Sequence, residues 1–161
     1  MSFASDVSKF AKLTGKSIDQ TGASIALELF SSIIKDTPAD TGRARGNWQC
    51  SLDAPITSQV NAGGAPGSES PAPDGDGSEA KKAIADVRNT AIKFIGGTTI
   101  YLTNNLPYIW SLEYGGYGRG DGATEKTGGT GFSIQAPAGM VRKNAARIQS
   151  IVAKAARENK V

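Results

Sequence analysis

The chain has 161 residues, of which 39% are hydrophobic and 20% are charged, and its formal net charge is +3. It contains no histidine, and Cys50 is its single cysteine. This excludes an intrachain disulfide, a zinc cage of thiolates and every catalytic centre that uses histidine. A chain of this length buries roughly 70% of its unfolded surface, so we predict one domain over residues 1–161.

The amino terminus carries neither the basic region nor the apolar segment of a secretion signal. No apolar run approaches the roughly 20 residues that cross a bilayer. We therefore expect a soluble protein that is made in a cytoplasm and has no membrane partner. Because the carboxylates are scattered and no phosphate-binding glycine motif is present, we also expect no catalytic residue, no cofactor and no bound metal.

Residues 2–34 are predicted to form a long helix. Gly15 is a candidate break in this helix, whereas Gly22 weakens it without ending it. A helix packed across a sheet explains the pattern better than a membrane-surface helix, which would be more strongly basic. The apolar side chains that recur at helical spacing are Phe3, Val7, Phe10, Ile18, Ile25, Leu29 and Ile33.

A turn is predicted directly after this helix. Pro38 cannot continue a helix, and Gly42 permits a positive φ. Arg43 and Arg45 follow; they point the same way if the next strand begins early, and the Asp40 carboxylate is a plausible partner for them. On composition alone, these arginines are simply solvated. The side chains suited to bonding with the backbone of a turn are Asp36, Thr37, Asp40 and Thr41.

A half-buried strand is predicted from Gly46 to about Ala54, because apolar and polar side chains alternate there. Trp48 is its largest anchor, and Cys50 is predicted to be a small core residue beside Leu52. Asn47, Gln49 and Ser51 are expected on the outer face. The strand is predicted to pair with Ile56–Val60.

Residues 61–77 consist almost wholly of glycine, proline, serine, alanine and acidic residues. Such a segment cannot bury enough apolar surface to offset its ordering entropy. We predict an arm that is mobile or is ordered by a partner chain.

The next predicted helix begins with Ser78 as its N-cap and runs to about Phe94, where Gly96 and Gly97 end it. Residues 98–103 then alternate as a second strand, with Ile100 and Leu102 on one face. The predicted inner face of the helix consists of Ala83, Ile84, Val87, Ala91 and Ile92.

The densest aromatic stretch, residues 105–115, is predicted to form a short helix. Pro107 suits its first turn, and Gly115 suits its C-terminal stop. Two interpretations stay open for its aromatic side chains: they fill the core, or they form an interface with a partner, where Trp and Tyr are favoured. The side chains that this helix presents are Tyr108, Trp110, Leu112, Glu113 and Tyr114.

Residues 115–131 are a second glycine-rich loop, which we expect to become ordered on assembly. After Pro137 the sequence predicts one amphipathic helix whose inner side carries Val141, Ala145, Ile148, Val152 and Ala155. The opposite, basic side either is solvated or contacts DNA phosphates or an acidic partner. It consists of Lys143, Arg147, Lys154 and Arg157.

Three segments together resemble a known family. They are Thr-Pro-Ala-Asp-Thr-Gly-Arg at 37–43, running into Trp48; Asn-Leu-Pro-Tyr-Ile-Trp-Ser-Leu-Glu-Tyr-Gly at 105–115; and Ser-Ile-Gln-Ala-Pro-Ala-Gly-Met-Val at 133–141. In this order, with a helix before and after, they resemble the HK97 gp10-like family of tail-completion or head–tail joining (neck) proteins of tailed bacteriophages. The similarity covers about residues 20–155. One departure is Ala44, where the family pattern has a leucine.

The resemblance implies an α+β fold, in which an antiparallel sheet packs against a long N-terminal helix, a middle helix and a C-terminal amphipathic helix, with long glycine-rich loops. It implies no catalytic, cofactor-binding or metal-binding residue. The residues that match its motifs, and are expected to serve structure or interface, are Pro38, Asp40, Thr41, Gly42, Arg43, Trp48, Pro107, Tyr108, Trp110, Glu113, Tyr114 and Gly115.

The function that this resemblance implies is a structural component of the virion neck, assembled in the host cytoplasm. Copies would form a ring, expected to be hexameric, that caps the tail and meets the head connector or stopper proteins. Its other partners would be the tail terminator or tail-tube protein and DNA passing through the lumen. Two alternatives remain: a tail terminator that stops tube growth, and a metal-dependent nuclease or DNA-binding factor that uses Asp36, Asp40 or Glu113.

Overall fold

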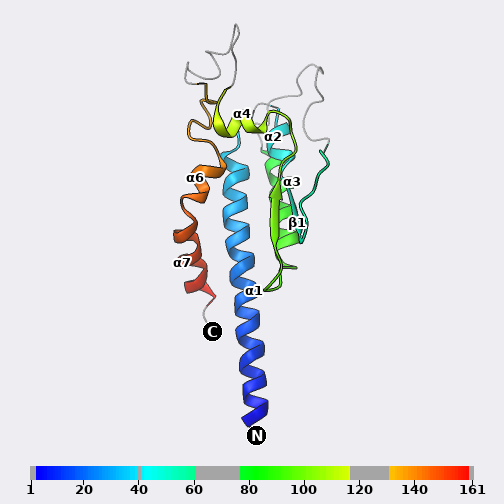
Figure 1. Ribbon diagram of the computed structural model, residues 1–161, viewed down its shortest axis with the longest axis vertical. Coiled ribbons are helices and arrows are strands. Elements are labelled where there is room, and N and C mark those ends of the chain that lie inside the picture. The colour runs from blue at the N-terminus through cyan, green and yellow to red at the C-terminus, as the bar shows by residue number, and fades with distance from the viewer. Residues whose placement is uncertain (1–2, 40, 61–76, 117–130, 160–161) are drawn as a thin grey trace.

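The computed structural model describes residues 3–39, 41–60, 77–116 and 131–159. One long helix, α1 (Phe3–Asp36), is the axis against which the other elements pack. Figure 1 shows the C-terminal helices along one side of its upper half and the strands with α3 along the other, while its lower half extends alone. The expectations for Asp40 and for most of the two glycine-rich segments, at 61–76 and 117–130, lie outside the described residues.

Helix α1 is continuous, so the predicted break at Gly15 is wrong. A Cβ at Gly15 would meet no atom within 4 Å, and one glycine costs a helix only about 1 kcal/mol. The helix ends at Asp36, where the Thr37 N–H still donates to the Ile33 carbonyl at 3.0 Å. Pro38 follows immediately, which confirms the predicted stop.

The α+β class is confirmed, with a two-stranded antiparallel sheet. Strand β1 (Gln49–Leu52) pairs with β2 (Ile100–Thr103), and Cys50 lies opposite Leu102. The predicted pairing of the first strand with Ile56–Val60 is wrong, because those residues form no strand. The Val60 N–H instead donates to the Asn47 side-chain oxygen at 3.0 Å.

Strand β1 also begins later than predicted. Residues Arg43–Gly46 form a helical turn, α2, so Arg43 and Arg45 do not lie on a strand. Arg45 binds the end of α1 through Nε to the Thr37 carbonyl at 2.7 Å. Asn47 was expected on the outer face but is fully buried, because its amide oxygen accepts the Val60 N–H and its Nδ2 donates to the Arg43 carbonyl at 2.9 Å.

Helix α3 (Ser78–Ala91) lies between β1 and β2 in the sequence and packs against α1. Its first residue is Ser78, with Gly77 as N-cap at φ 65°, so the predicted serine cap is wrong. It ends before Phe94, because the Phe94 N–H turns back to the Ala91 carbonyl at 3.0 Å. Ile92, predicted inside, is therefore 73% exposed, whereas Ala83, Val87 and Ala91 are buried as predicted.

The predicted single C-terminal helix is two helices, α6 (Val141–Ala145) and α7 (Ile148–Glu158). Ala145 and Val152, expected to face inward, are exposed. The buried positions are Asn144, Ile151 and Ala155. The hydrophobic pattern misplaced this face because a buried asparagine, satisfied by hydrogen bonds, occupies one inward position.

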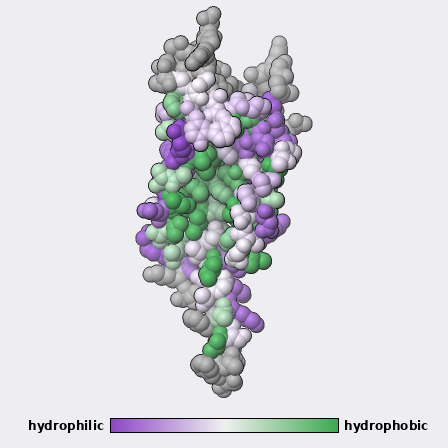
Figure 2. All heavy atoms as spheres, in the orientation of Figure 1, coloured by the Kyte–Doolittle hydropathy of each residue, from purple (hydrophilic) through white to green (hydrophobic). Residues whose placement is uncertain are grey.

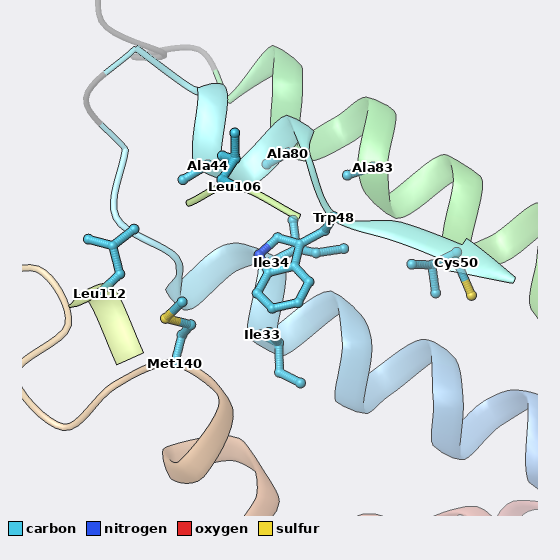
Figure 3. Close-up of a cluster of buried hydrophobic side chains, with 11 residues drawn as sticks. Ile33, Ile34, Ala44, Trp48, Cys50, Ala80, Ala83, Leu106, Leu112 and Met140 are labelled. Atoms are coloured by element: carbon cyan, nitrogen blue, oxygen red, sulfur yellow. The ribbon is translucent and has the colours of Figure 1, made fainter. Parts of the chain in front are cut away.

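The hydrophobic core gathers around the upper end of α1 (Figure 3). Trp48 is 6% exposed and Cys50 is 5% exposed, as predicted for both. Ala44, which stands where the family pattern has a leucine, is also buried. The cluster consists of Ile33, Ile34, Ala44, Trp48, Cys50, Ala80, Ala83, Val87, Leu106, Leu112 and Met140.

Candidate interface at the junction of three segments

The first of the three family-like segments is bonded to the end of α1. The Trp48 indole Nε1 donates to the Thr37 hydroxyl oxygen at 2.8 Å. That hydroxyl in turn donates to the Ile33 carbonyl at 2.8 Å. Because Thr37 and Trp48 are both buried, this relay satisfies the indole N–H inside the core and holds the turn between them against the helix.

The second segment is bonded to the third through Glu113. Helix α4 (Ile109–Tyr114) carries this glutamate, which is 5% exposed. Its carboxylate accepts the backbone N–H groups of Met140 at 2.8 Å, Val141 at 2.8 Å and Arg142 at 2.9 Å. The Arg142 Nε adds a fourth bond at 3.1 Å. A carboxylate that binds the otherwise unpaired N–H groups of a first helical turn stabilises that helix start.

Gly139 makes this approach sterically feasible. Its φ is 73°, and a Cβ at this position would lie 2.6 Å from the Glu113 carbonyl oxygen. A side chain there would push α4 and α6 apart. The helix predicted to open at Pro137 begins only at Val141. Gly139 was not among the expected site residues, although a glycine inside the first turn of a predicted helix is a signal that could have pointed to it.

The third segment also bonds back to the first. Gln135 Oε1 accepts the Ala39 N–H at 2.8 Å. In helix α6, which follows this segment, the Asn144 amide donates to the Asp36 carboxylate at 2.7 Å, and the Lys143 ammonium lies 3.2 Å from the same carboxylate. The three segments therefore form one bonded junction at the upper end of α1.

The other motif residues of the first and second segments shape local turns. Gly42 has a φ of 75° and precedes α2, and the Thr41 hydroxyl accepts the Arg43 N–H at 3.4 Å. Pro107 is exposed in the turn before α4, which begins at Ile109, so its predicted place in the first helical turn is wrong. Gly115, at φ 82°, ends α4 as predicted.

The aromatic side chains of α4 divide between the two interpretations that the sequence left open. Tyr108 is half-buried against the core. Trp110 is 68% exposed and Tyr114 is 53% exposed, and their rings stack with centroids 5.1 Å apart. The Arg142 guanidinium lies 4.9 Å from the Tyr114 ring centroid. These two rings form an ordered, outward aromatic surface, which is the arrangement that protein interfaces favour.

A pocket of about 160 Å³ opens beside this aromatic surface. The Asn104 amide in its wall donates to the Ala44 carbonyl at 2.8 Å, and its oxygen accepts the Leu106 N–H at 3.3 Å. Since the polar groups of Trp48, Asn104 and Glu113 are engaged within the chain, the pocket suits an apolar group better than a charged one. Its lining is Trp48, Asn104, Ile109, Trp110, Glu113, Tyr114, Met140 and Val141.

Two lysines of the predicted basic face form ion pairs with carboxylates of α1. Lys154 lies 2.8 Å from the Glu28 carboxylate, which raises the pKa of the lysine through a hydrogen bond and charge. Lys143 is paired with Asp36, and the Arg147 Nη1 donates to the Asn144 oxygen at 3.3 Å. Arg157 is exposed. This arrangement favours neither the DNA nor the acidic-partner interpretation over a solvated face.

Asp36 and Glu113, the two described carboxylates of the three considered for a nuclease, are engaged in structural bonds. Glu113 binds the start of α6, and Asp36 binds Asn144 and Lys143. Within the described ranges, no group of three or more His, Cys, Asp or Glu residues is placed to hold a metal ion. No helix there combines the length and apolar character needed to cross a bilayer.

Comparison of the chain with protein-family models, with curated proteins and with solved structures finds no match.

Proposed function

We propose that this protein is a structural component of the neck of a tailed bacteriophage, where copies of it form a ring that completes the tail and joins it to the head. The observation that supports the proposal is the junction described above. The three segments that resemble the family are far apart in the sequence, yet Glu113, Gln135 and Thr37 bond them into one unit.

The outward face of this junction is the proposed contact surface. Trp110 and Tyr114 are held on a short helix that Glu113 anchors from below. Rigid, exposed aromatic rings lose little conformational entropy on binding and are frequent anchors of interfaces. We propose that this surface meets a neighbouring copy or the head connector in the ring.

The proposal is tested by electron microscopy of lysates from a phage that lacks this gene. We expect filled heads beside separate tails of normal length. Overlong tail tubes would instead assign the protein to tail termination, and intact infectious particles would refute both roles.

A matched pair of variants tests the contact surface in the same assay. We expect the double variant Trp110→Ala, Tyr114→Ala to fold but to leave heads and tails unjoined. Ile134→Ala is the control, because Ile134 is 61% exposed but lies outside the stacked pair. Full joining by the double variant would refute the assigned surface.

A further inference from the structure

Helix α1 carries one line of apolar side chains that the described part of the chain leaves exposed in the lower half of the helix and only half-buries in the upper half. Val7, Ile18, Ile25 and Leu29 follow one another at helical spacing and share a face. Val7 is 48% exposed and Ile18 is 57% exposed, whereas Ile25 and Leu29 are half-buried. The line therefore runs from the free lower half of α1 into its packed upper half.

Contacts on both sides show where the upper part of this line faces. On one side Glu28 pairs with Lys154 of α7. On the other side Gly22 lies against the Phe94 ring, since a Cβ there would be 2.3 Å from that ring. The line faces the space between these two contacts. Figure 2 shows a hydrophobic band over α1 at this place, with hydrophilic surface on both sides.

In the part of the chain that the structure describes, the lower half of α1 extends away from the other helices and the strands (Figure 1). Helix α1 joins the rest of the molecule at Ser17, whose hydroxyl donates to the Asn159 carbonyl, and at Asp19, which accepts the Gly96 N–H at 2.6 Å. Below these contacts the helix runs on alone (Figure 1). Residues 3–17 span about 22 Å, and an isolated helix of roughly 15 residues is marginal in water.

We propose that the free chain pairs with a second copy of itself, with the two α1 helices antiparallel and crossing near Ile18. The projecting half of each helix then lies on the apolar band of the other copy. Counting equally in both directions from Ile18 places Val7 opposite Leu29 and Ala11 opposite Ile25. Thr14 falls opposite Gly22, beside the Phe94 ring that packs there.

The occupant is a second copy because the same molecule supplies both uncovered surfaces, a helical arm below Ile18 and an apolar band above it. An isologous two-fold pair covers both surfaces on both copies at once. A different partner on the band would leave the arm bare.

Coverage of the apolar surface favours the antiparallel direction. In a parallel pair each arm would lie beside the other arm, and the band of neither copy would receive an arm. Lys9, Lys12 and Lys16 are exposed on the side of the arm away from the apolar line. In the antiparallel pair the lysines of the two copies lie at opposite ends, in solvent. The inference concerns the chain before any assembly and does not depend on the proposed function.

Sedimentation equilibrium tests the pairing. We expect a dimer for the unmodified chain and a folded monomer for Ile18→Asp, with helical content lost in the uncovered arm alone. Leu13→Asp is the matched control, because Leu13 is 54% exposed on the same helix but lies about 140° around it from Ile18. It should remain a dimer. A monomeric unmodified chain, or equal loss of the dimer in both variants, would overturn the proposal.

Cysteine cross-linking tests the direction. Val7→Cys and Leu29→Cys proteins are mixed and oxidised; we expect the mixed disulfide to dominate, and Leu13→Cys mixed with Leu29→Cys to give none. Because Cys50 is buried, the unmodified chain is the control in which no disulfide should form. The two engineered positions are about 33 Å apart in one copy, too far for an internal bridge. A dominant disulfide between two Val7→Cys chains would show parallel arms and overturn the proposal.

Discussion

Single side chains at the upper end of α1 combine packing with hydrogen bonding. Trp48 fills the core and also donates its indole N–H to Thr37. Glu113 is a buried carboxylate, and it accepts hydrogen bonds from four donors at the start of α6. Buried polar groups of this kind are stable only while all their partners stay in place, so we expect substitutions here to cost more than their buried area suggests.

We expect Trp48→Ala to lower the free energy of unfolding by roughly 3–5 kcal/mol, because it empties a large site in the core. Trp48→Phe keeps a ring but removes the bond to Thr37, and should cost about 1 kcal/mol from that bond. Urea denaturation measures both changes. Similar losses for the two variants would mean that the hydrogen bond, and not the packing, is the main contribution of Trp48.

Cys50 should be unreactive in the folded protein. Burial, together with the charge of Asp86, raises its pKa from 9.0 to about 11, and only the thiolate reacts. A thiol reagent at neutral pH should label the chain in urea but not in buffer. Between pH 9.0 and about 11 the unfolded thiol loses its proton while the folded one keeps it, so stability should fall as pH rises there and be unaffected by this group below that range.

At the scale of elements, α1 tolerates its glycines for different reasons. Gly15 lies on the free lower half with nothing near it, whereas Gly22 lets the Phe94 ring pack against the helix. The same residue type therefore weakens the helix at one position and serves tertiary packing at the other.

This difference predicts opposite outcomes for the same substitution. Gly15→Ala should raise helical content and stabilise α1 by about 0.5–1 kcal/mol. Gly22→Ala should lose about 1 kcal/mol of stability, because overpacking displaces Phe94 and outweighs the gain in helix propensity. Circular dichroism with thermal denaturation distinguishes the two. Equal stabilisation by both would contradict the close Phe94 contact.

The start of α6 depends on α4. Glu113→Ala removes the acceptor of three backbone N–H groups and of Arg142, and we expect a loss on the order of 3 kcal/mol. Gly139→Ala should destabilise the same junction by steric clash. Hydrogen exchange of the Met140 and Val141 amides is the measurement. Unchanged protection in Glu113→Ala would show that α6 forms without this bond.

At the scale of the whole molecule, the described core is built without the long acidic segment. Every member of the core cluster comes from other parts of the chain. The residues that flank it make described contacts: the Val60 N–H donates to the Asn47 side-chain oxygen, and the Lys81 N–H donates to the Gly77 carbonyl.

Because residues 61–76 carry few apolar side chains to bury, replacing them with a glycine–serine linker of equal length should leave the melting temperature nearly unchanged. We expect it to weaken assembly of the proposed ring, which negative-stain microscopy would show. An unfolded replacement variant would place this segment in the core. Full ring assembly would refute its role between subunits.

Local physics was enough for the sequence to determine the long first helix, the stop at Pro38, the burial of Trp48 and Cys50, and the end of α4 at Gly115. Each depends on a residue's own backbone limits or on a short hydrophobic period. Only the tertiary structure decided that β1 pairs with β2, that the C-terminal helix breaks, and that Asn47 and Asn144 are buried. The structure also decided that Glu113 caps the start of α6 and that Arg45 binds carbonyl oxygens at the end of α1. These outcomes depend on partners distant in sequence, which composition and periodicity do not contain.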